Sequence, residues 1–293
     1  MAERPIDYTL VFAEIYTNNQ EFENFLTRLR FIDGAIDFSG LPTYNDLPDQ
    51  LQLGGLEEFA NSLSEATQSD PDRQERGGWA HIQSDRPTLL FPYNPTIGTT
   101  KYDSERELFM FLVNPHSINT EKTKPAVFVH SHPISRTFSI EDAFNFFRDD
   151  NDVDPIASIV STPKYNFLLL RSSETSGISL EEFNNFFSKY MEHAWTHGGE
   201  IYQSIMFQLS LSNIDPDYFS TLIDKFGGDA GEFYQDLITL MLLSKECRAG
   251  FYISDKDGVY KRLDREKIIK LMEKIFINNQ PTSLDSNNLQ TTD

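Results

Sequence analysis

His130, His132 and Asp142 lie in one short stretch of this sequence, and their types and spacing suit the binding of a metal ion. The apolar residues 125–129 predict a buried strand that leads into the two histidines. Side chains two apart on a strand point to the same face, so both imidazoles could reach one ion. Ser139 is a typical helix N-cap, which places Asp142 in the first helical turn. Two nitrogen ligands, one oxygen ligand and a fourth position left for water match a catalytic zinc site.

The histidine pair also has a plainer interpretation, because many pairs with this spacing are ordinary surface or core residues. The metal interpretation gains strength from the residues after the pair, since Pro133 comes directly next, and Ser139 and Asp142 come at a workable spacing. His81 and His116 have no such neighbours, and we expect them to be ordinary surface or half-buried residues.

His193 and His197 lie four residues apart on a predicted helix, a spacing that could bind metal. The intervening residues contain no glutamate of the H-E-x-x-H type, so a second zinc site is disfavoured. The helix is expected to end or kink at the two glycines that come after His197.

Glu75 is the candidate general base. It precedes a predicted strand that begins with Gly77 and Gly78, where the backbone can be approached closely. A zinc hydrolase needs a group that takes a proton from the metal-bound water and returns it to the leaving group, and a glutamate that is not a ligand suits this role. Taken alone, Glu75 would be interpreted as a solvated charge before a turn.

Together these residues resemble the JAMM (JAB1/MPN/Mov34) metalloprotease family. The family pattern is a glutamate near a glycine, a long gap, H-[S/T]-H-P, a short loop and S-x-x-D. This chain matches it with Glu75 and Gly78, then residues 130–133, then residues 139–142. The loop before the aspartate is one residue shorter than in the best-known members, which is similar to prokaryotic JAB-like domains found near toxins, phage genes and ubiquitin-like conjugation systems.

The resemblance implies a role for each residue of the motif. It implies zinc (Zn2+) held by His130, His132 and Asp142. It implies Glu75 as the general acid and base, and Ser139 as a group that stabilises the oxyanion of the tetrahedral intermediate. The long gap from Glu75 to His130 and the absence of a cysteine before the glycine depart from many relatives, but neither departure removes a ligand.

The resemblance also implies the fold, an α/β (α+β) protein with a mixed β-sheet flanked by helices and a JAB1/MPN-like, cytidine-deaminase-like core. We expect this core to span residues 72–176. Residues 1–71 form a mostly helical N-terminal region. Residues 177–277 form a helical C-terminal region with a β-hairpin near 250–263, and residues 278–293 form a disordered tail. The hairpin could rejoin the catalytic sheet or belong to a separate C-terminal domain, and we favour the second.

Several elements outside the motif are predicted from hydrophobic periodicity. Residues 20–31 and 56–66 have apolar side chains at helical spacing, and so do the residues that come after Ser139. Residues 156–162 and 167–171 are apolar and predict two buried strands joined by a turn.

Composition restricts the partners of this chain. It has 293 residues and a formal net charge of −20. A strongly acidic protein is a poor partner for nucleic acid or an anionic membrane, so we expect neither. Cys247 is the one cysteine, which excludes an internal disulfide and fits a reducing compartment; we expect it to be buried. With neither a signal peptide nor an apolar membrane span in the sequence, we expect a cytoplasmic protein, with export that uses no cleaved signal as the alternative.

The favoured function is a zinc-dependent peptidase or isopeptidase. By resemblance, its substrate is a protein or peptide, such as the C-terminal tail of ubiquitin or a ubiquitin-like protein. One alternative is a non-catalytic MPN-type scaffold that binds partners, but scaffolds of that fold usually lack a ligand, and all three are present here. The other alternative is a toxin-associated metal hydrolase with a non-peptide target.

Overall fold

The structure is a computed structural model. It describes residues 12–14, 20–83, 89–92, 96–97, 99–103, 108–112, 123–133, 137–148, 153–185, 240, 243–244 and 246–263. His116, His193 and His197 lie outside the described residues. So do the expected tail and most of the helices predicted between residues 186 and 277.

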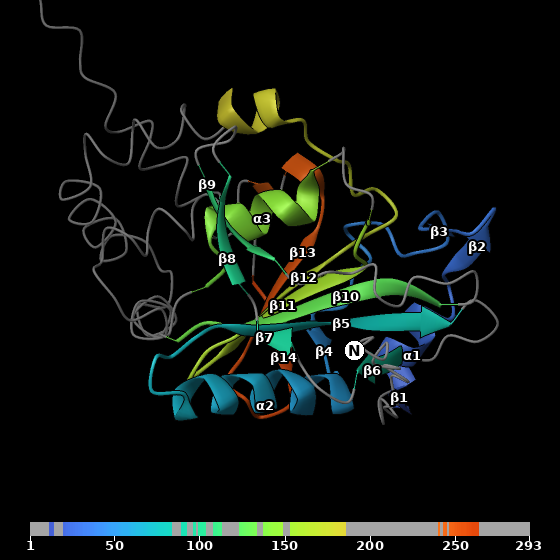
Figure 1. Cartoon of the computed structure of the whole chain (residues 1–293). Helices are drawn as coiled ribbons and strands as arrows, with labels where there is room; N and C mark the ends of the chain where they lie inside the picture. Colours follow the sequence, from blue (N-terminus) through green and yellow to red (C-terminus); the bar gives the residue numbers. More distant parts are fainter. Residues whose placement is uncertain are drawn as a thin grey trace, which may run out of the picture.

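Within the described residues, ten strands form one mixed sheet (Figure 1). In spatial order its main path contains β1 (Phe12–Glu14), β6 (Leu89–Pro92), β5 (Arg76–Gln83), β10 (Thr123–Ser131), β11 (Ala157–Ser161), β12 (Asn166–Leu170), β13 (Gly250–Ser254), β14 (Tyr260–Arg262) and β4 (Gln50–Leu51). Beside this path, β7 (Thr96–Ile97) pairs with β5. β10 and β11 are parallel, and the other pairs are antiparallel. The predicted mixed sheet flanked by helices is confirmed.

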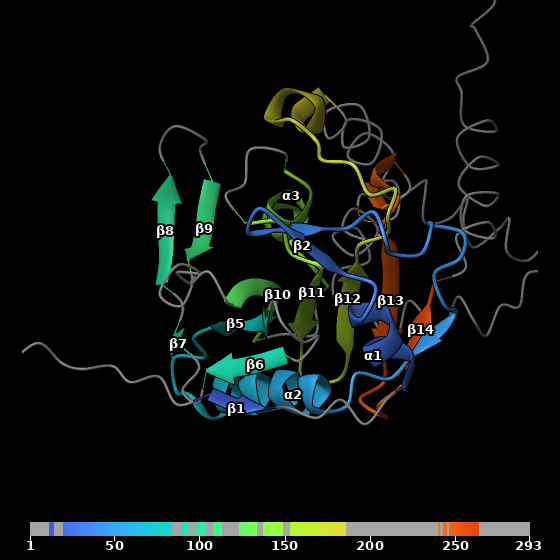
Figure 2. The same cartoon turned by 90° about the vertical axis from the view of Figure 1, so that its right-hand side faces the viewer.

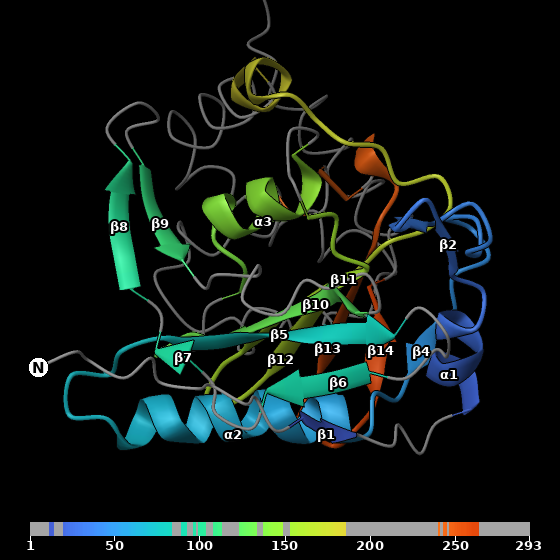
Figure 3. The same cartoon turned by 45° about the vertical axis from the view of Figure 1, so that its right-hand side comes forward.

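Two helices lie on opposite faces of the sheet (Figures 1 and 3). α2 (Gly55–Ser69) runs along one face, and α3 (Ile140–Phe147) lies on the other, in the crossover between β10 and β11. Two small antiparallel pairs, β2 (Arg30–Ile32) with β3 (Ala35–Asp37) and β8 (Thr99–Asp103) with β9 (Leu108–Leu112), are separate from the main sheet (Figure 2). A third helix, α1 (Gln20–Leu26), packs its buried face into the main core.

The core lies where α1 and α2 cover the sheet. Every residue of β11, β12 and β13 is buried, as expected for central strands covered on both faces. On α2 the apolar residues Leu56, Ala60 and Leu63 recur at helical spacing and are fully buried. The predictions of a helix at residues 56–66 and of strands at residues 156–162 and 167–171 are therefore confirmed, to within a few residues at the ends.

Two predicted elements differ from the structure. The helix expected over residues 20–31 ends at Leu26, because the chain then enters the β2–β3 hairpin. Its two-residue turn is Asp33-Gly34, both with positive φ, which is a strong hairpin signal. The hairpin near residues 250–263 joins the main sheet through the β12–β13 pair, so its assignment to a separate C-terminal domain was wrong. The N-terminal region also adds a strand beside that hairpin, since β4 pairs with β14.

A polar layer lies between α2 and one end of the sheet. The strand register aligns four polar residues in one row: Ser131 on β10, Ser161 on β11, Asn166 on β12 and Ser254 on β13. α2 contacts this row at three points. Glu57 Oε1 accepts hydrogen bonds from Ser254 and Asn166, Asn61 Oδ1 accepts one from Asn166, and Thr67 shares one with Ser131. The helix is therefore fixed to the sheet by directional bonds as well as by its apolar face.

Glu57 is the ionisable member of that layer. It is only 5% exposed, and its Oε2 has no hydrogen-bond partner among the described residues. Burial raises the pKa of Glu57, and the hydrogen bonds from Ser254 and Asn166 offset this only in part. The fold therefore favours the protonated form of this carboxyl group.

Arg171 joins the segment before β11 to the end of α3. Its Nε donates to the carbonyl of Pro155 at 2.9 Å, and Nη2 lies 3.2 Å from Asp154 Oδ1. The guanidinium group also lies over the rings of Phe38 and Phe146, at 4.8 and 5.6 Å from their centroids. This buried cation is thus paired, hydrogen-bonded and stacked, which offsets its desolvation.

Cys247 is buried, as predicted. Burial raises the pKa of its thiol to about 12, so the reactive thiolate is scarce at neutral pH. Among the described residues, no helix combines the length and apolar character that crossing a bilayer requires.

Candidate metal centre

His130 in β10 and His132, the first residue after it, lie on one face of the sheet. His130 pairs with Gly77 of β5, and two residues earlier Phe128 pairs with Trp79. The rings on this face succeed one another: Trp79 contacts Phe128, Phe128 stacks on His130, and His130 meets His132 edge-on, with centroids 4.9–5.1 Å apart. Strand alternation therefore places both imidazoles side by side, as the sequence predicted. Gly77 has no side chain, so it adds no group beside the His130 ring.

Asp142, the third candidate ligand, lies in the first turn of α3. Ser139 is the N-cap of this helix, and its Oγ accepts a hydrogen bond from Asp142 N. In return Asp142 Oδ2 accepts one from Ser139 N at 2.8 Å, which completes a capping box. The cap predicted from sequence is confirmed. It holds the Asp142 side chain at the start of the helix, where the carboxylate also faces the two imidazoles.

His130, His132 and Asp142 form a compact triangle of ligand atoms. Nε2 of His130 lies 3.2 Å from Nε2 of His132 and 3.2 Å from Asp142 Oδ1. Nε2 of His132 lies 3.4 Å from Asp142 Oδ2. These three residues are the group of metal-ligating type found among the described residues.

The dimensions of this triangle fit a tetrahedral metal ion. Ligands about 2.0–2.2 Å from zinc at tetrahedral angles are about 3.3–3.6 Å apart. The two imidazole nitrogens are 3.2 Å apart, and each lies within 3.4 Å of a different oxygen of the Asp142 carboxylate. His130, His132 and Asp142 would hold such an ion, which would accept water as a further ligand. The residues present therefore fit a metal with an open coordination site, and two imidazoles with one carboxylate are ligands that zinc accepts.

The centre is shielded from solvent but not sealed. His130 is fully buried, and the side chains of His132 and Asp142 are 8% and 12% exposed. Burial by itself raises the pKa of Asp142, but the imidazoles of His130 and His132 outweigh it and hold that pKa well below its ordinary value. The carboxylate is therefore ionised at neutral pH, which is the state that binds a cation.

Glu75 lies outside this triangle, immediately before β5, and is half-buried. The β5–β10 register pairs Gly77 with His130, so its extension by two residues brings Glu75 opposite His132. Paired residues share a face, and alternate residues return to the same face. The regular pairing ends at Gly77, and alternation continued beyond it predicts that Glu75 lies on the face of the sheet that bears the histidines.

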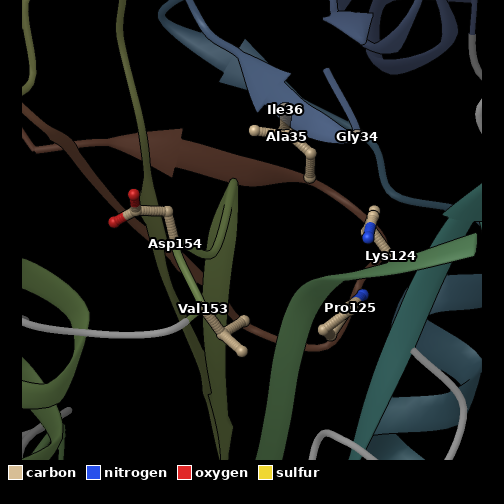
Figure 4. A pocket seen from close by; sticks show the side chains of 7 residues that line it. All are labelled: Gly34, Ala35, Ile36, Lys124, Pro125, Val153 and Asp154. Carbon is tan, nitrogen blue, oxygen red and sulfur yellow. The ribbon is translucent and has the colours of Figure 1, made fainter. Parts of the chain in front are cut away.

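Two other features lie away from the centre. His81, expected at the surface or half-buried, is buried, with its Nδ1 3.1 Å from the carbonyl of Trp79. A cavity of about 180 Å³ lies at the other end of β10, between the β2–β3 hairpin and Lys124, Pro125, Val153 and Asp154 (Figure 4). It is smaller than the ~300–1,000 Å³ typical of small-molecule sites.

Sequence reasoning missed the buried pair Thr67 and Ser131. Their hydroxyl oxygens are 2.5 Å apart, so they join α2 to β10 at the residue that lies between the two histidines. The polar Thr67 on the buried face of a predicted helix was a usable signal, but its partner could not be identified before the sheet was known.

Comparison of the chain with protein-family models, with curated proteins and with solved structures finds no match. The geometry of the site and the resemblance of its motif therefore support the function proposed below.

Proposed function

We propose that this protein is a zinc-dependent amide hydrolase of the JAMM type, with a JAB1/MPN-like core. The observation that supports the proposal most directly is the convergence of His130, His132 and Asp142, which each offer one ligand atom within 4.8 Å of the others. The sheet with a helix in the β10–β11 crossover is compatible with such a core. The family, the metal and the reaction are parts of this one proposal.

When bound, zinc would acidify a water molecule and polarise the carbonyl group of an amide. Glu75 would act as general base and acid, accepting a proton from the attacking water and returning it to the leaving amine. Ser139 Oγ accepts a hydrogen bond from Asp142 N, so its own proton can be donated to the carbonyl oxygen as that atom gains negative charge. Each role is assigned by the motif and is consistent with the position of the residue.

The proposed substrate is a peptide or isopeptide bond. By resemblance, the bond lies at the C-terminal tail of ubiquitin or of a ubiquitin-like protein. An extended tail can add to a strand edge, where main-chain hydrogen bonds bind it without regard to most side chains.

The test is zinc content combined with hydrolysis. We expect one zinc per chain in the wild type, loss of zinc in His132→Ala, and zinc without hydrolysis in Glu75→Gln. His81→Gln is the matched control, because it changes a buried histidine on the neighbouring strand that is not part of the triangle. Substrates are fluorogenic peptide amides and a fluorogenic amide of the ubiquitin C-terminus. Zinc retained in His132→Ala would refute the ligand assignment, and full activity in Glu75→Gln would assign the base elsewhere.

A further inference from the structure

The C-terminal end of α2 holds both segments from which the candidate site is built. On the side of the histidines, Gln68 Nε2 donates to the carbonyl of Pro133 at 2.8 Å, and Thr67 contacts Ser131. On the side of Glu75, Asp70 forms an ion pair with Arg76 at 2.8 Å. One turn of helix thus contacts two strands that meet at the metal face, but it does so from the opposite face of the sheet.

Ser131 is the central residue of this arrangement. It lies between His130 and His132, so alternation directs its side chain away from the metal face and toward α2. Its Oγ accepts a hydrogen bond from Arg76 N at 3.0 Å and lies 3.2 Å from Arg76 O. The regular pairing of β5 with β10 extends to His130 and Gly77. One residue further along, at Ser131 and Arg76, the side-chain hydroxyl of Ser131 contacts the backbone of Arg76 in place of a regular strand pair.

Thr67 completes the restraint on the other side of Glu75. Its Oγ1 donates to the carbonyl of Gln74 at 3.1 Å and lies 2.5 Å from Ser131 Oγ. A chain in which Arg76 N–H donates to Ser131, Ser131 donates to Thr67, and Thr67 donates to the Gln74 carbonyl uses each proton once. The residues before and after Glu75 are therefore both bound from the face opposite the metal, by two fully buried hydroxyls.

We propose that Ser131 and Thr67 are positioning residues, whose hydroxyls hold the backbone of residues 74–76 so that the Glu75 carboxylate faces the metal. This rests on the proposed function, in which Glu75 is the base. Neither hydroxyl touches the ligand triangle, and neither reaches the metal face. Their effect on the centre passes through the backbone on either side of Glu75.

The chain supplies a matched control for this proposal. Ser161 is the neighbour of Ser131 in the polar row, on the adjacent strand, and is also fully buried. Its hydroxyl donates to Asn166 Oδ1 at 2.6 Å rather than to the segment around Glu75. Ser161→Ala therefore removes a buried hydroxyl of the same kind, together with its hydrogen bond to Asn166, but leaves residues 74–76 bound.

The experiment measures the metal-bound water rather than turnover, so it needs no substrate. The full-length protein is loaded with Co2+ in place of zinc, and its visible absorption is recorded against pH, since deprotonation of a bound water changes the spectrum. A carboxylate beside that water disfavours hydroxide, so Glu75→Gln should lower the midpoint by about 1–3 pH units. Ser131→Ala and Thr67→Val should lower it by about half of that displacement or more, while cobalt stoichiometry stays at the wild-type value. Ser161→Ala and Thr67→Ser should keep the wild-type midpoint.

The outcomes separate this proposal from the proposed function. A shift in Glu75→Gln with wild-type midpoints in both Ser131→Ala and Thr67→Val overturns the positioning role alone. A shift of equal size in Ser161→Ala also overturns it, because general softening of the sheet would then explain the effect. No shift in Glu75→Gln, or no bound cobalt, overturns the proposed function and this proposal with it. Thr67→Val keeps the shape of threonine, so it tests the role even where Ser131→Ala fails to fold.

Discussion

Replacing Asp142 by asparagine removes one metal ligand with almost no change of shape. The carboxylate lies 3.2 and 3.4 Å from the two imidazole nitrogens, and its ionised state is favoured by them. An amide has no charge, and one of its two terminal atoms is a donor that cannot bind a cation. Changing only an outer partner of a ligand already weakens metal binding about 10–100-fold, so loss of the ligand itself should exceed about 100-fold.

The consequence for stability comes from linkage. At a free zinc concentration 100 times its dissociation constant, the wild type should gain about 2.7 kcal/mol of unfolding free energy. A variant that binds at least 100-fold more weakly gains about 0.4 kcal/mol or less. At about 2–4 °C per kcal/mol for a chain of this size, zinc should raise the Tm of the wild type by about 5–11 °C and that of Asp142→Asn by less than about 2 °C.

The assay is thermal unfolding of metal-stripped protein with and without buffered zinc. Asp142 also caps α3 through Ser139, and that loss lowers the Tm of the variant in both conditions, so only the zinc-induced difference is compared. Glu141→Gln is the matched control, since Glu141 is an acidic residue in the same helical turn that lies outside the triangle. Equal zinc-induced shifts in wild type and Asp142→Asn would refute the assignment of Asp142 as a ligand.

Two further predictions concern stability. Because the folded pKa of Glu57 is raised, the contribution of this group to stability falls as pH rises above about 4.3. The advantage of Glu57→Gln over the wild type in urea unfolding should therefore grow from pH 4.5 to pH 8, and a constant difference would contradict the raised pKa. Arg171→Met strands the buried carbonyl of Pro155 and should lower the unfolding free energy by about 2–4 kcal/mol, whereas Arg248→Met, at an exposed pair with Glu174, should change it by about 1 kcal/mol or less. Similar losses in both arginine variants would show that burial is not the cause.

The ligand triangle was predictable because its causes are local. Alternation along one strand places His130 and His132 on a common face, and a serine cap places Asp142 in the first turn of the next helix. The positions of all three ligands could be predicted from the short stretch of chain between residues 125 and 142. Individual buried strands were predictable in the same way, since apolar runs such as residues 156–162 suit them, whereas the mixed sheet was expected from the resemblance of the motif.

The position of Glu75 depended on pairing between distant segments. Its sequence shows a charge before a strand, and nothing nearby specifies which strand will be its neighbour. The β5–β10 register ends at Gly77 and His130, and alternation continued by two residues predicts that Glu75 lies opposite His132. The hydroxyls of Thr67 and Ser131 then bind the backbone on either side of it, across 64 residues of chain.

The errors have the same origin. The helix predicted to reach residue 31 was favoured by apolar spacing, but the Asp33-Gly34 turn pairs Phe31 with Ile36 in a hairpin. The late hairpin was interpreted as a separate domain, but its strand β13 buries all five residues beside β12. Strand pairing depends on which surface buries the most apolar area, and that choice is made between segments far apart in sequence.

The sequence by itself determined the ligand types, their common face and the cap that positions the third ligand, because alternation, helical period and capping act over a few residues. Only the tertiary structure decided that α2 covers one face of the sheet and that the late hairpin joins its strands. It also decided that two buried hydroxyls bind the backbone on either side of Glu75. These relations depend on burial and hydrogen bonding between distant segments, which no local pattern specifies.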